Sequence, residues 1–552
     1  MTVAHYILRA FATALICCAI QSSLAIAQDD LQSAIKQRLI GLSQPNGNKI
    51  ARDAVVAVSF IDAFYKARNY QPAWRDAGNF ADLRREILEA RNDGLGLHDF
   101  HAHALGFGGL DFWPPAMTPA ERDILKTSAL VNLLYQLYFG KVSPERLDPH
   151  WNLQRQASLP LENAARTISI ALETRALPAL IAQARGDDPG YLRLRAALKK
   201  YRGILDRGGW PTIAAGAVLK PGNADARVPS IRKRLETTGD YKGNTQSESQ
   251  LCGPTLVDAV KAFQKRHGID IDGVVGPAMT RAMNVSAKQR VDQIRVNLER
   301  ARWGARTLRK KKDLVVVNIA GFYLITVLNG KFAWSTDVIT GKPYHKTPVF
   351  TDRIRYIEFN PTWTIPPGII RNEVLPKLKA DPGYLGAKGY DLIASNGTKI
   401  NPVTVNWQSI NARGFPYRVV QPPGPKNALG LVKFMFPNKY NVYLHDTPGR
   451  QLFSKTGRAF SHGCVRVKDP MKFAEVLLGH RNGATRQKID QIVGSAKQTR
   501  INLKEPIPVA IMYWTVDPLW GDGIRFYVVH DYQNYCPQIP ILGRSVIITS
   551  IP

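Results

Sequence analysis

The N-terminal part of the chain, from residue 28 to about residue 215, repeats apolar residues at intervals of three and four positions. This spacing places apolar side chains along one face of an amphipathic helix. The loops between the repeats are rich in Gly, Pro and aromatic residues. The pattern therefore predicts a mostly helical domain over residues 28–220. The segments that carry it are Phe80–Arg91, Pro119–Phe139 and Asn163–Ala184.

A second, smaller helical unit is predicted over residues 221–286. It opens with a linker of Pro, Gly, Asn and Asp at 221–227, and a turn at Asp272–Pro277 uses glycine for special backbone angles and proline to open a helix. A basic helix, Ser286–Thr307, then leads through residues 287–312 into the next domain. The three helices predicted for the small unit are Ile231–Thr238, Thr255–His267 and Pro277–Met283.

From Asp313 the pattern changes to short apolar runs typical of strands, which predicts a β-rich domain over residues 313–502. The interval of about 370–419 has a different character, with several Gly and Asn residues, and is consistent with an insertion. Residues 503–552 are expected to close the domain. The whole chain is thus expected to be a multidomain α+β protein. The strands expected are Leu314–Ile319, Phe322–Leu328, Phe332–Ile339, Ile507–Val516 and Ile524–His530.

The first 27 residues have the pattern of a cleaved export signal. Arg9 supplies the positive charge, Ala10–Ile20 the apolar run, and Ala25–Ala27 the small-residue cleavage site. We therefore expect residues 1–27 to be removed on export. The mature chain would keep three cysteines, and the sequence leaves open whether two of them, Cys252 and Cys536, form a disulfide.

The chain of 552 residues is strongly basic, with 74 Lys and Arg against 44 Asp and Glu and a formal net charge of +30. Such an excess predicts a polyanionic neighbour, which is a nucleic acid, an anionic membrane surface or an acidic polymer such as cell wall. No signature of a nucleic-acid-binding fold accompanies the charge, so no nucleic-acid partner is expected.

The candidate chemistry lies in residues 434–467, where His445 precedes Cys464 by nineteen positions. A thiol beside an imidazole is suited to covalent acyl transfer, and we expect the imidazole to lower the thiol pKa. Gly463 lets the backbone approach a substrate, so the amides of Gly463 and Cys464 are candidate oxyanion donors. His445, His462 and Cys464 lack the paired spacing of a zinc site, so neither a metal nor a cofactor is expected.

The motif Ser461-His462-Gly463-Cys464-Val465-Arg466, with its upstream histidine, resembles the active-site signature of YkuD-type L,D-transpeptidases, and its flanks resemble the larger YcbB-like branch. The turn at Gly268–Pro277 resembles that of small peptidoglycan-binding domains. The resemblance implies a helical scaffold domain, a peptidoglycan-binding-like domain and a catalytic domain with a lid at about 370–419. It also implies that Cys464 is the nucleophile and that His445 is the base, oriented by a backbone carbonyl.

Five further residues are candidates for the cleft around this pair. Tyr443 is expected near the oxyanion. Arg466 has two readings, a ligand for a substrate carboxylate or a partner within the fold. Trp363 belongs either to the cleft wall or to packing. His462 and Ser461 are secondary candidates for substrate binding.

The function implied is a periplasmic enzyme that cross-links diaminopimelate residues of peptidoglycan stem peptides, with release of D-alanine from a tetrapeptide stem. Its substrates would be peptidoglycan stems and glycan strands. Peptidoglycan synthases and carboxypeptidases would be its protein partners, and its activity would affect cell shape. Water or a lipoprotein lysine could resolve the same thioester instead, giving an L,D-carboxypeptidase, an amidase or a lipoprotein-anchoring enzyme. A non-catalytic wall-binding scaffold is the alternative of a different class.

Overall fold

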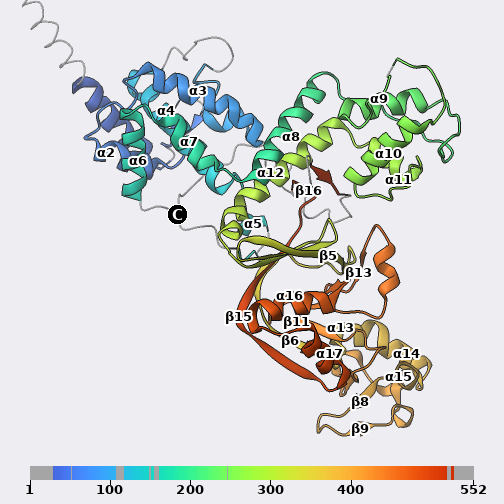
Figure 1. Ribbon diagram of the computed structural model, residues 1–552. Helices are drawn as coiled ribbons and strands as arrows, with labels where there is room; N and C mark the ends of the chain where they lie inside the picture. The colour runs from blue at the N-terminus through green and yellow to red at the C-terminus, as the bar shows by residue number, and fades with distance from the viewer. Residues whose placement is uncertain are drawn as a thin grey trace, which may run out of the picture.

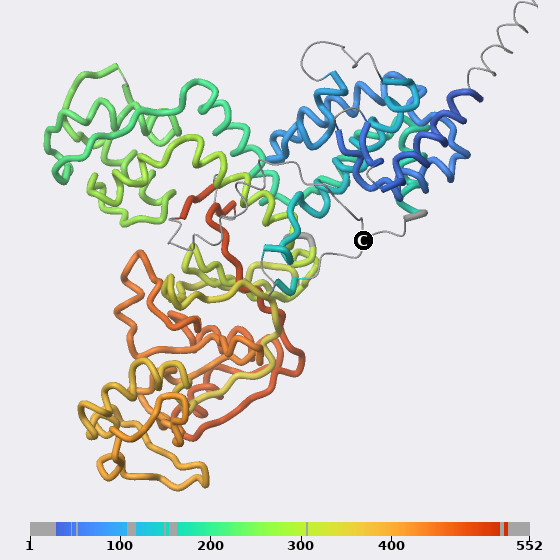
Figure 2. Tube along the Cα trace, turned by 180° about the vertical axis from the view of Figure 1, so that it is seen from behind, coloured from blue at the N-terminus to red at the C-terminus, as the bar shows by residue number. Residues whose placement is uncertain are grey.

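The computed structural model shows a helical half joined by one long helix to a β-rich half (Figures 1 and 2). The export signal, Cys536 and the predicted strand residues beyond 527 lie outside the described residues. The fold is a multidomain α+β architecture, as predicted. The structure describes residues 29–45, 47–50, 53–106, 117–147, 151–153, 161–244, 246–518 and 524–527.

The N-terminal domain packs its helices around α4, whose inner face is almost wholly buried. Thr118 caps this helix through a hydrogen bond from Glu121 N–H. The segment predicted at Asn163–Ala184 is two helices, because Arg175 adopts a left-handed conformation (φ 59°) that ends the first one. The elements are a helix over 29–42, β1 Lys49–Ile50, β2 Asp53–Ala54, α2 Val58–Ala67, α3 Ala77–Ala90, η1 Arg91–Asp93, η2 Leu97–Phe100, α4 Pro119–Phe139, α5 Pro144–Leu147, α6 Leu161–Glu173 and α7 Leu177–Arg185.

The small domain contains the three predicted helices, α9 Val228–Thr238, α10 Pro254–Arg266 and α11 Pro277–Met283, around a core of its own. The predicted linker is part of this domain, because Leu219 bridges to Val275 and Ala224 bridges to Leu251. Cys252 is fully buried in this core, and its burial raises the pKa of the thiol.

Helix α12, Ala287–Arg309, crosses the centre of the molecule beside α8, Pro189–Asp206 (Figure 1). Its Glu299 is completely buried, and the carboxylate accepts hydrogen bonds from the Val142 amide at 2.8 Å and the Trp303 indole at 3.0 Å. Arg302 pairs with the same carboxylate at 2.6 Å. On the other side, Arg300 donates to the Tyr513 carbonyl at 2.8 Å. Helix α12 therefore connects the N-terminal and β-rich domains through buried polar contacts.

The β-rich domain is built on a nine-stranded mixed sheet in the order β13-β5-β14-β12-β11-β6-β15-β3-β4. Helix α16, Pro470–Asn482, and helix α17, Arg486–Gly494, pack their apolar residues into its core. The strands are β3 Leu314–Asn318, β4 Tyr323–Leu328, β5 Lys331–Gly341, β6 Phe350–Phe359, β11 Val432–Met435, β12 Leu444–His445, β13 Ala459–Ser461, β14 Val465–Val467 and β15 Thr499–Met512.

The C-terminal strand differs in its bounds from the predicted Ile507–Val516. β15 begins at Thr499 and is interior to the sheet, where it pairs antiparallel with β6 and parallel with β3. Two short strands follow, β16 Val516–Asp517 and β17 Arg525–Phe526. Among the residues that the structure describes, no helix combines the length and the apolar composition needed to cross a membrane.

Residues 363–421 form a separate subdomain at the far end of the β-rich domain, with its own four-stranded sheet in the order β7-β10-β8-β9 and its own core (Figure 1). We call it the lid subdomain. It contains the predicted insertion and also Trp363. Its elements are β7 Trp363–Thr364, α13 Pro367–Ile369, η3 Ile370–Val374, α14 Leu375–Ala380, α15 Tyr384–Lys388, β8 Asp391–Ile393, β9 Lys399–Ile400, η4 Pro402–Thr404, η5 Trp407–Ser409, η6 Ala412–Gly414 and β10 Arg418–Gln421.

The buried carboxylate of Glu299 provides a test of this architecture. Glu299→Ala leaves Arg302 without its buried charge partner, so we expect the free energy of unfolding to fall by about 3–5 kcal/mol. Urea unfolding followed by tryptophan fluorescence measures the change. Glu236→Ala, at an exposed position of α9, is the matched control and should change stability by less than about 0.5 kcal/mol. Equal stability of the two variants would contradict the role of Glu299 as the buried charge partner of Arg302.

Candidate active site

The pairing of two short parallel strands brings His445 and Cys464 together. In the register of β12 and β14, Leu444 lies opposite Val465 and His445 lies opposite Arg466. Side chains alternate between the faces of a sheet, so Leu444 and Val465 enter the core while His445 and Arg466 lie on the other face. Cys464 directly precedes β14, two positions before Arg466, and shares the face of the histidine.

The buried imidazole of His445 is held as a neutral base. Its Nδ1–H donates to the backbone carbonyl of Asp446 at 2.5 Å, which leaves Nε2 unprotonated. This contact agrees with the expectation that a carbonyl orients the ring. Burial, together with Arg466 nearby, lowers the pKa of His445 to about 3. The Asp446 carboxylate accepts from the Leu431 amide at 2.9 Å and pairs with Arg450 at 3.2 Å, so it is engaged in holding the loop.

The Cys464 thiol differs from its prediction. It donates to the carbonyl oxygen of Asn441 at 3.6 Å, and within the described part of the chain no hydrogen bond joins it to His445. Burial raises the pKa of the thiol, although the nearby Tyr443 and Arg466 oppose this effect. Burial therefore favours a neutral thiol beside a neutral imidazole, in contrast to the expected lowering of the thiol pKa by the imidazole.

Tyr443 connects the nucleophile to the lid subdomain. Its side chain hydrogen-bonds the Cys464 thiol, and the Trp363 indole N–H donates to it. Burial and the neighbouring thiol raise the pKa of Tyr443, so its hydroxyl stays protonated. The Trp363 ring also packs at 6.4 Å from that of Tyr390 in the lid subdomain. Trp363 thus combines the two roles considered for it, packing in the lid and a position at the cleft.

The turn before the nucleophile is fixed by hydroxyl groups. Ser461 is buried, and its Oγ donates to the Cys464 carbonyl at 2.5 Å and accepts from the Gly463 amide at 3.1 Å. Gly463 has φ 116°, a conformation that favours glycine, and its carbonyl accepts from Thr347 Oγ1 at 2.8 Å. Ser461 therefore shapes the turn, and its part in substrate binding stays a prediction.

The oxyanion donors are also revised. The Gly463 amide is occupied by Ser461, so it does not serve as predicted in this conformation. The Cys464 amide has no hydrogen-bond acceptor among the described residues. It and the Tyr443 hydroxyl are the donors placed beside the thiol.

A row of charged residues crosses the sheet through the site. The register aligns Arg500, Glu358, Lys433, His445 and Arg466 on five neighbouring strands. Lys433 pairs with Glu358 at 2.9 Å. No short sequence motif contains Lys433 and Glu358, and only the pairing of β6 with β11 reveals them.

Arg466 itself pairs with no carboxylate in the described residues, and its Nε is buried without a hydrogen-bond partner. Burial lowers the pKa of its guanidinium, while the Cys464 thiolate form opposes that shift. Of the two readings of Arg466, the partner within the fold is not observed.

His462 contacts the lid subdomain. Its Nε2 lies 2.7 Å from a carboxylate oxygen of Glu373 on η3, and its ring lies 4.6 Å from that of His345. Burial, with His462 and Lys342 nearby, lowers the pKa of His345. The contact between His462 and Glu373 joins the nucleophile turn to the lid, a role that the sequence did not indicate. In the described residues, no group of three or more His, Cys, Asp or Glu side chains could hold a metal ion.

Comparison with protein families assigns each region. Residues 312–509 match the L,D-transpeptidase catalytic domain (YkuD), residues 59–198 match a scaffold domain, and residues 224–283 match a domain described as "Putative peptidoglycan binding domain". The chain therefore carries a YkuD-type L,D-transpeptidase catalytic domain together with a peptidoglycan-binding domain.

Two curated relatives share parts of the chain. A "Putative L,D-transpeptidase" of Haemophilus influenzae is 34% identical over 225 residues, which are 41% of this chain and 45% of the relative. The N-acetylmuramoyl-L-alanine amidase CwlL of Bacillus licheniformis is 36% identical over 70 residues, 13% of this chain and 19% of the relative. The chain thus spans less than half the length of each of these relatives.

Solved structures give a weaker likeness. An L,D-transpeptidase from Mycobacterium smegmatis is 13% identical, with 36% of this chain and 58% of the other covered and a TM-score of 0.18. An L,D-transpeptidase from Xylanimonas cellulosilytica is also 13% identical, with 54% of this chain and 99% of the other covered and a TM-score of 0.17.

The neutral resting pair predicts a particular pH dependence of thiol reactivity. Because burial raises the thiol pKa, alkylation of Cys464 by iodoacetamide should increase about tenfold per pH unit from pH 6 to 8, following the thiolate fraction. Mass spectrometry of the modified peptide gives the rate, and the fully buried Cys252 should stay unmodified as long as the protein is folded. A rate that is constant between pH 6 and 8 would contradict the neutral pair.

The contact between lid and nucleophile turn predicts a local change of stability. Glu373→Gln removes the charge facing His462, and a partly exposed pair of this kind contributes about 0.2–1 kcal/mol. Hydrogen exchange of residues 370–374 should therefore become up to about fivefold faster. Glu475→Gln, at an ion pair outside the lid, is the control and should leave exchange of residues 370–374 unchanged. Unchanged exchange in Glu373→Gln would show that the pair does not hold the lid.

Proposed function

We propose that the protein is a cysteine L,D-transpeptidase that forms cross-links between diaminopimelate residues of peptidoglycan stem peptides. The observation that carries this proposal is the β12–β14 register, which places the free Nε2 of a neutral, carbonyl-held His445 on the same face as the Cys464 thiol. The match of residues 312–509 to the L,D-transpeptidase catalytic domain supports the reaction class.

In the first half-reaction, the Cys464 sulfur attacks the carbonyl carbon that joins diaminopimelate to D-alanine, and the thiol proton passes to His445 Nε2. The negative oxygen that forms is stabilised by the Cys464 amide and the Tyr443 hydroxyl. The carbon–nitrogen bond then breaks, and His445 returns its proton to the departing D-alanine amine. The product of this half is a thioester on Cys464.

In the second half-reaction, the side-chain amine of an acceptor diaminopimelate attacks the thioester carbonyl and gives its proton to His445. The carbon–sulfur bond breaks, and the sulfur takes the proton back. The result is a new amide between two stems and a regenerated thiol. A low pKa for His445 keeps the base unprotonated between the two steps.

Substrate carboxylates account for the positive charge of the site. Arg466 lies beside His445 in the register and has a buried Nε without a partner, and a guanidinium can bind a carboxylate through two hydrogen bonds. We assign it the free carboxylate of the donor stem. His462 is not needed as a base, because it is paired with Glu373.

The export signal and the basic charge support a periplasmic location, where peptidoglycan is the acidic polymer. Peptidoglycan synthases and carboxypeptidases are the proposed partners, since they make the strands and the tetrapeptide stems that the reaction uses.

The test is intact-protein mass spectrometry of residues 28–552 with disaccharide-tetrapeptide. We expect a transient adduct that Cys464→Ala abolishes and Cys252→Ala retains, followed by free D-alanine and a cross-linked dimer. Tyr443→Phe should slow acylation by about 100-fold or more, because one oxyanion donor is lost. D-alanine with only tripeptide would indicate a carboxypeptidase, and no adduct at all would leave the non-catalytic scaffold.

A further inference from the structure

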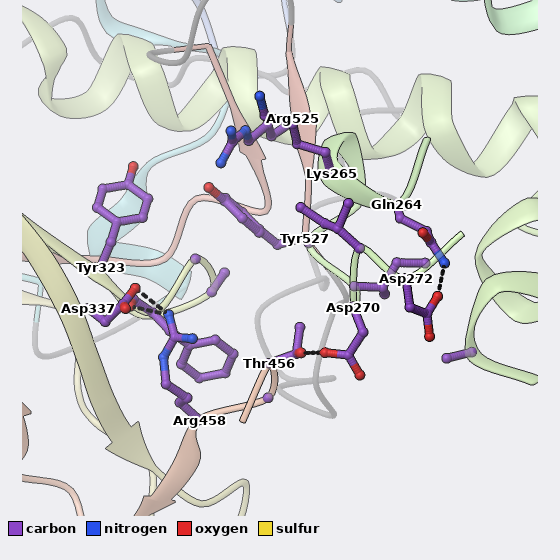
Figure 3. Close-up of a pocket in the computed structure, with 18 of the residues that line it drawn as sticks. Gln264, Lys265, Asp270, Asp272, Tyr323, Asp337, Thr456, Arg458, Arg525 and Tyr527 are labelled. Atoms are coloured by element: carbon purple, nitrogen blue, oxygen red, sulfur yellow. Dashed lines mark hydrogen bonds and ion pairs between the residues drawn. The ribbon is translucent and has the colours of Figure 1, made fainter. Parts of the chain in front are cut away.

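A cleft of about 740 Å³ separates the small domain from the β-rich domain (Figure 3). One wall is the end of α10 and the turn that follows it, residues 264–279. The opposite wall comes from the start of β4, the middle of β5 and the loop at 456–458. Neither Cys464 nor His445 lines this cleft, so it is distinct from the candidate active site.

Contacts across the cleft show that its two walls are joined. Thr456 Oγ1 donates to the carboxylate of Asp270 on the small domain (Figure 3). At the base of the cleft, His267 stacks on Phe526 with a ring separation of 5.5 Å. Gly268 lies so close to Tyr527 that an added Cβ would be 3.0 Å from the ring. The cleft is therefore a built feature of the domain arrangement.

The charges of the cleft cancel, although the whole chain has a formal charge of +30. Four acidic and four basic side chains line it, so a polyanion would meet as many repelling as attracting groups. Carboxylates accept hydrogen bonds and ammonium and guanidinium groups donate them, so this mixture suits a neutral ligand whose hydroxyls do both. The charged residues are Lys265, Asp270, Asp272, Asp337, Arg458, Lys468, Asp469 and Arg525.

Apolar surface accompanies these polar groups. Ile271 is 56% exposed and lines the cleft. Phe322 and Tyr527 lie in the opposite wall. Polar groups beside apolar patches match a sugar, which presents hydroxyls at its rim and C–H groups on its faces.

Strand β5 connects the cleft to the candidate active site within the fold. Asp337 lines the cleft, and Ile339, two residues further, lies opposite Arg466 on β14. Two residues of strand span about 7 Å. The cleft loop at 456–458 also runs directly into β13, which ends at Ser461. The cleft and the turn before Cys464 thus share strand β5 and the segment 456–461, and the residues of β5 between them are buried.

We propose that this cleft binds the neutral sugar backbone of a peptidoglycan strand whose stem peptide enters the active site. The identity of the sugar rests on the proposed function. The binding site is shared, since the peptidoglycan-binding domain supplies one wall and the catalytic domain the other.

The experiment measures binding of chitotetraose, an uncharged oligomer of N-acetylglucosamine, to residues 28–552 carrying Cys464→Ala. The test variant adds Lys265→Ala and Lys468→Ala, one on each wall. The matched control adds Lys233→Ala and Lys488→Ala, which remove two exposed lysines of the same domains outside the cleft. We expect the test variant to weaken binding at least tenfold and the control to change it less than twofold.

A second readout ties the cleft to the reaction. In chains with Cys464 intact, the test variant should raise KM for a stem peptide carried on a glycan strand and leave KM for the sugar-free stem peptide unchanged. A uniform loss on both substrates would show a structural defect and overturn the proposal. Absence of chitotetraose binding, or equal binding by test and control variants, would also overturn it.

The remaining outcomes separate this inference from the proposed function. Competition between an acidic polysaccharide and chitotetraose that depends on the cleft lysines would identify the ligand as a polyanion. That result would overturn the proposal. Sugar binding at the cleft without any thioester at Cys464 would refute the proposed enzyme and retain the binding site. A thioester and a cross-linked dimer without sugar binding would refute the binding site and retain the proposed enzyme.

Discussion

The parallel pairing of β12 with β14 is the contact on which the site depends. These strands have only two and three residues, so few hydrogen bonds hold them, and a separate set of polar contacts fixes the loop between them. The Asp446 carboxylate anchors its first turn, and Thr347 and Ser461 anchor its last. Gly430 accommodates Asp446, because an added Cβ would lie 2.3 Å from that carboxylate. Without these anchors, the pairing of β12 with β14 would not fix the position of Cys464 relative to His445.

The burial that positions the site also sets its protonation. An imidazole and a thiol removed from water both favour their neutral forms, which lowers one pKa and raises the other. A protein that needed a permanent thiolate would leave the pair more exposed or add a cation partner. Here Arg466 is close, but its effect on the thiol is smaller than that of burial. The arrangement suits a nucleophile that is activated only as it attacks.

The larger architecture brings three further surfaces to this pair. The lid subdomain contacts the neighbours of the pair, Tyr443 through Trp363 and His462 through Glu373. The peptidoglycan-binding domain faces the catalytic domain across a charge-balanced cleft. Helix α12 connects the N-terminal domain to the β-rich domain through Glu299 and Arg300. Polar contacts accompany the apolar clusters at these junctions. Such contacts require correct geometry, so they fix the angle between domains that a purely apolar interface would leave free.

The sequence by itself determined the local features of this protein. Spacing of apolar residues placed α4 and the three helices of the small domain, and the short motif around Cys464 pointed to the candidate thiol and histidine, because helix periodicity and a turn with glycine are encoded within a few neighbouring residues. Only the tertiary structure decided what depends on residues far apart in the chain. It placed β15 inside the sheet, assigned Ser461 to the turn, occupied the Gly463 amide, paired Lys433 with Glu358, and joined His462 to Glu373. Strand register and burial set these contacts and the pKa values, and neither is written in any local stretch of sequence.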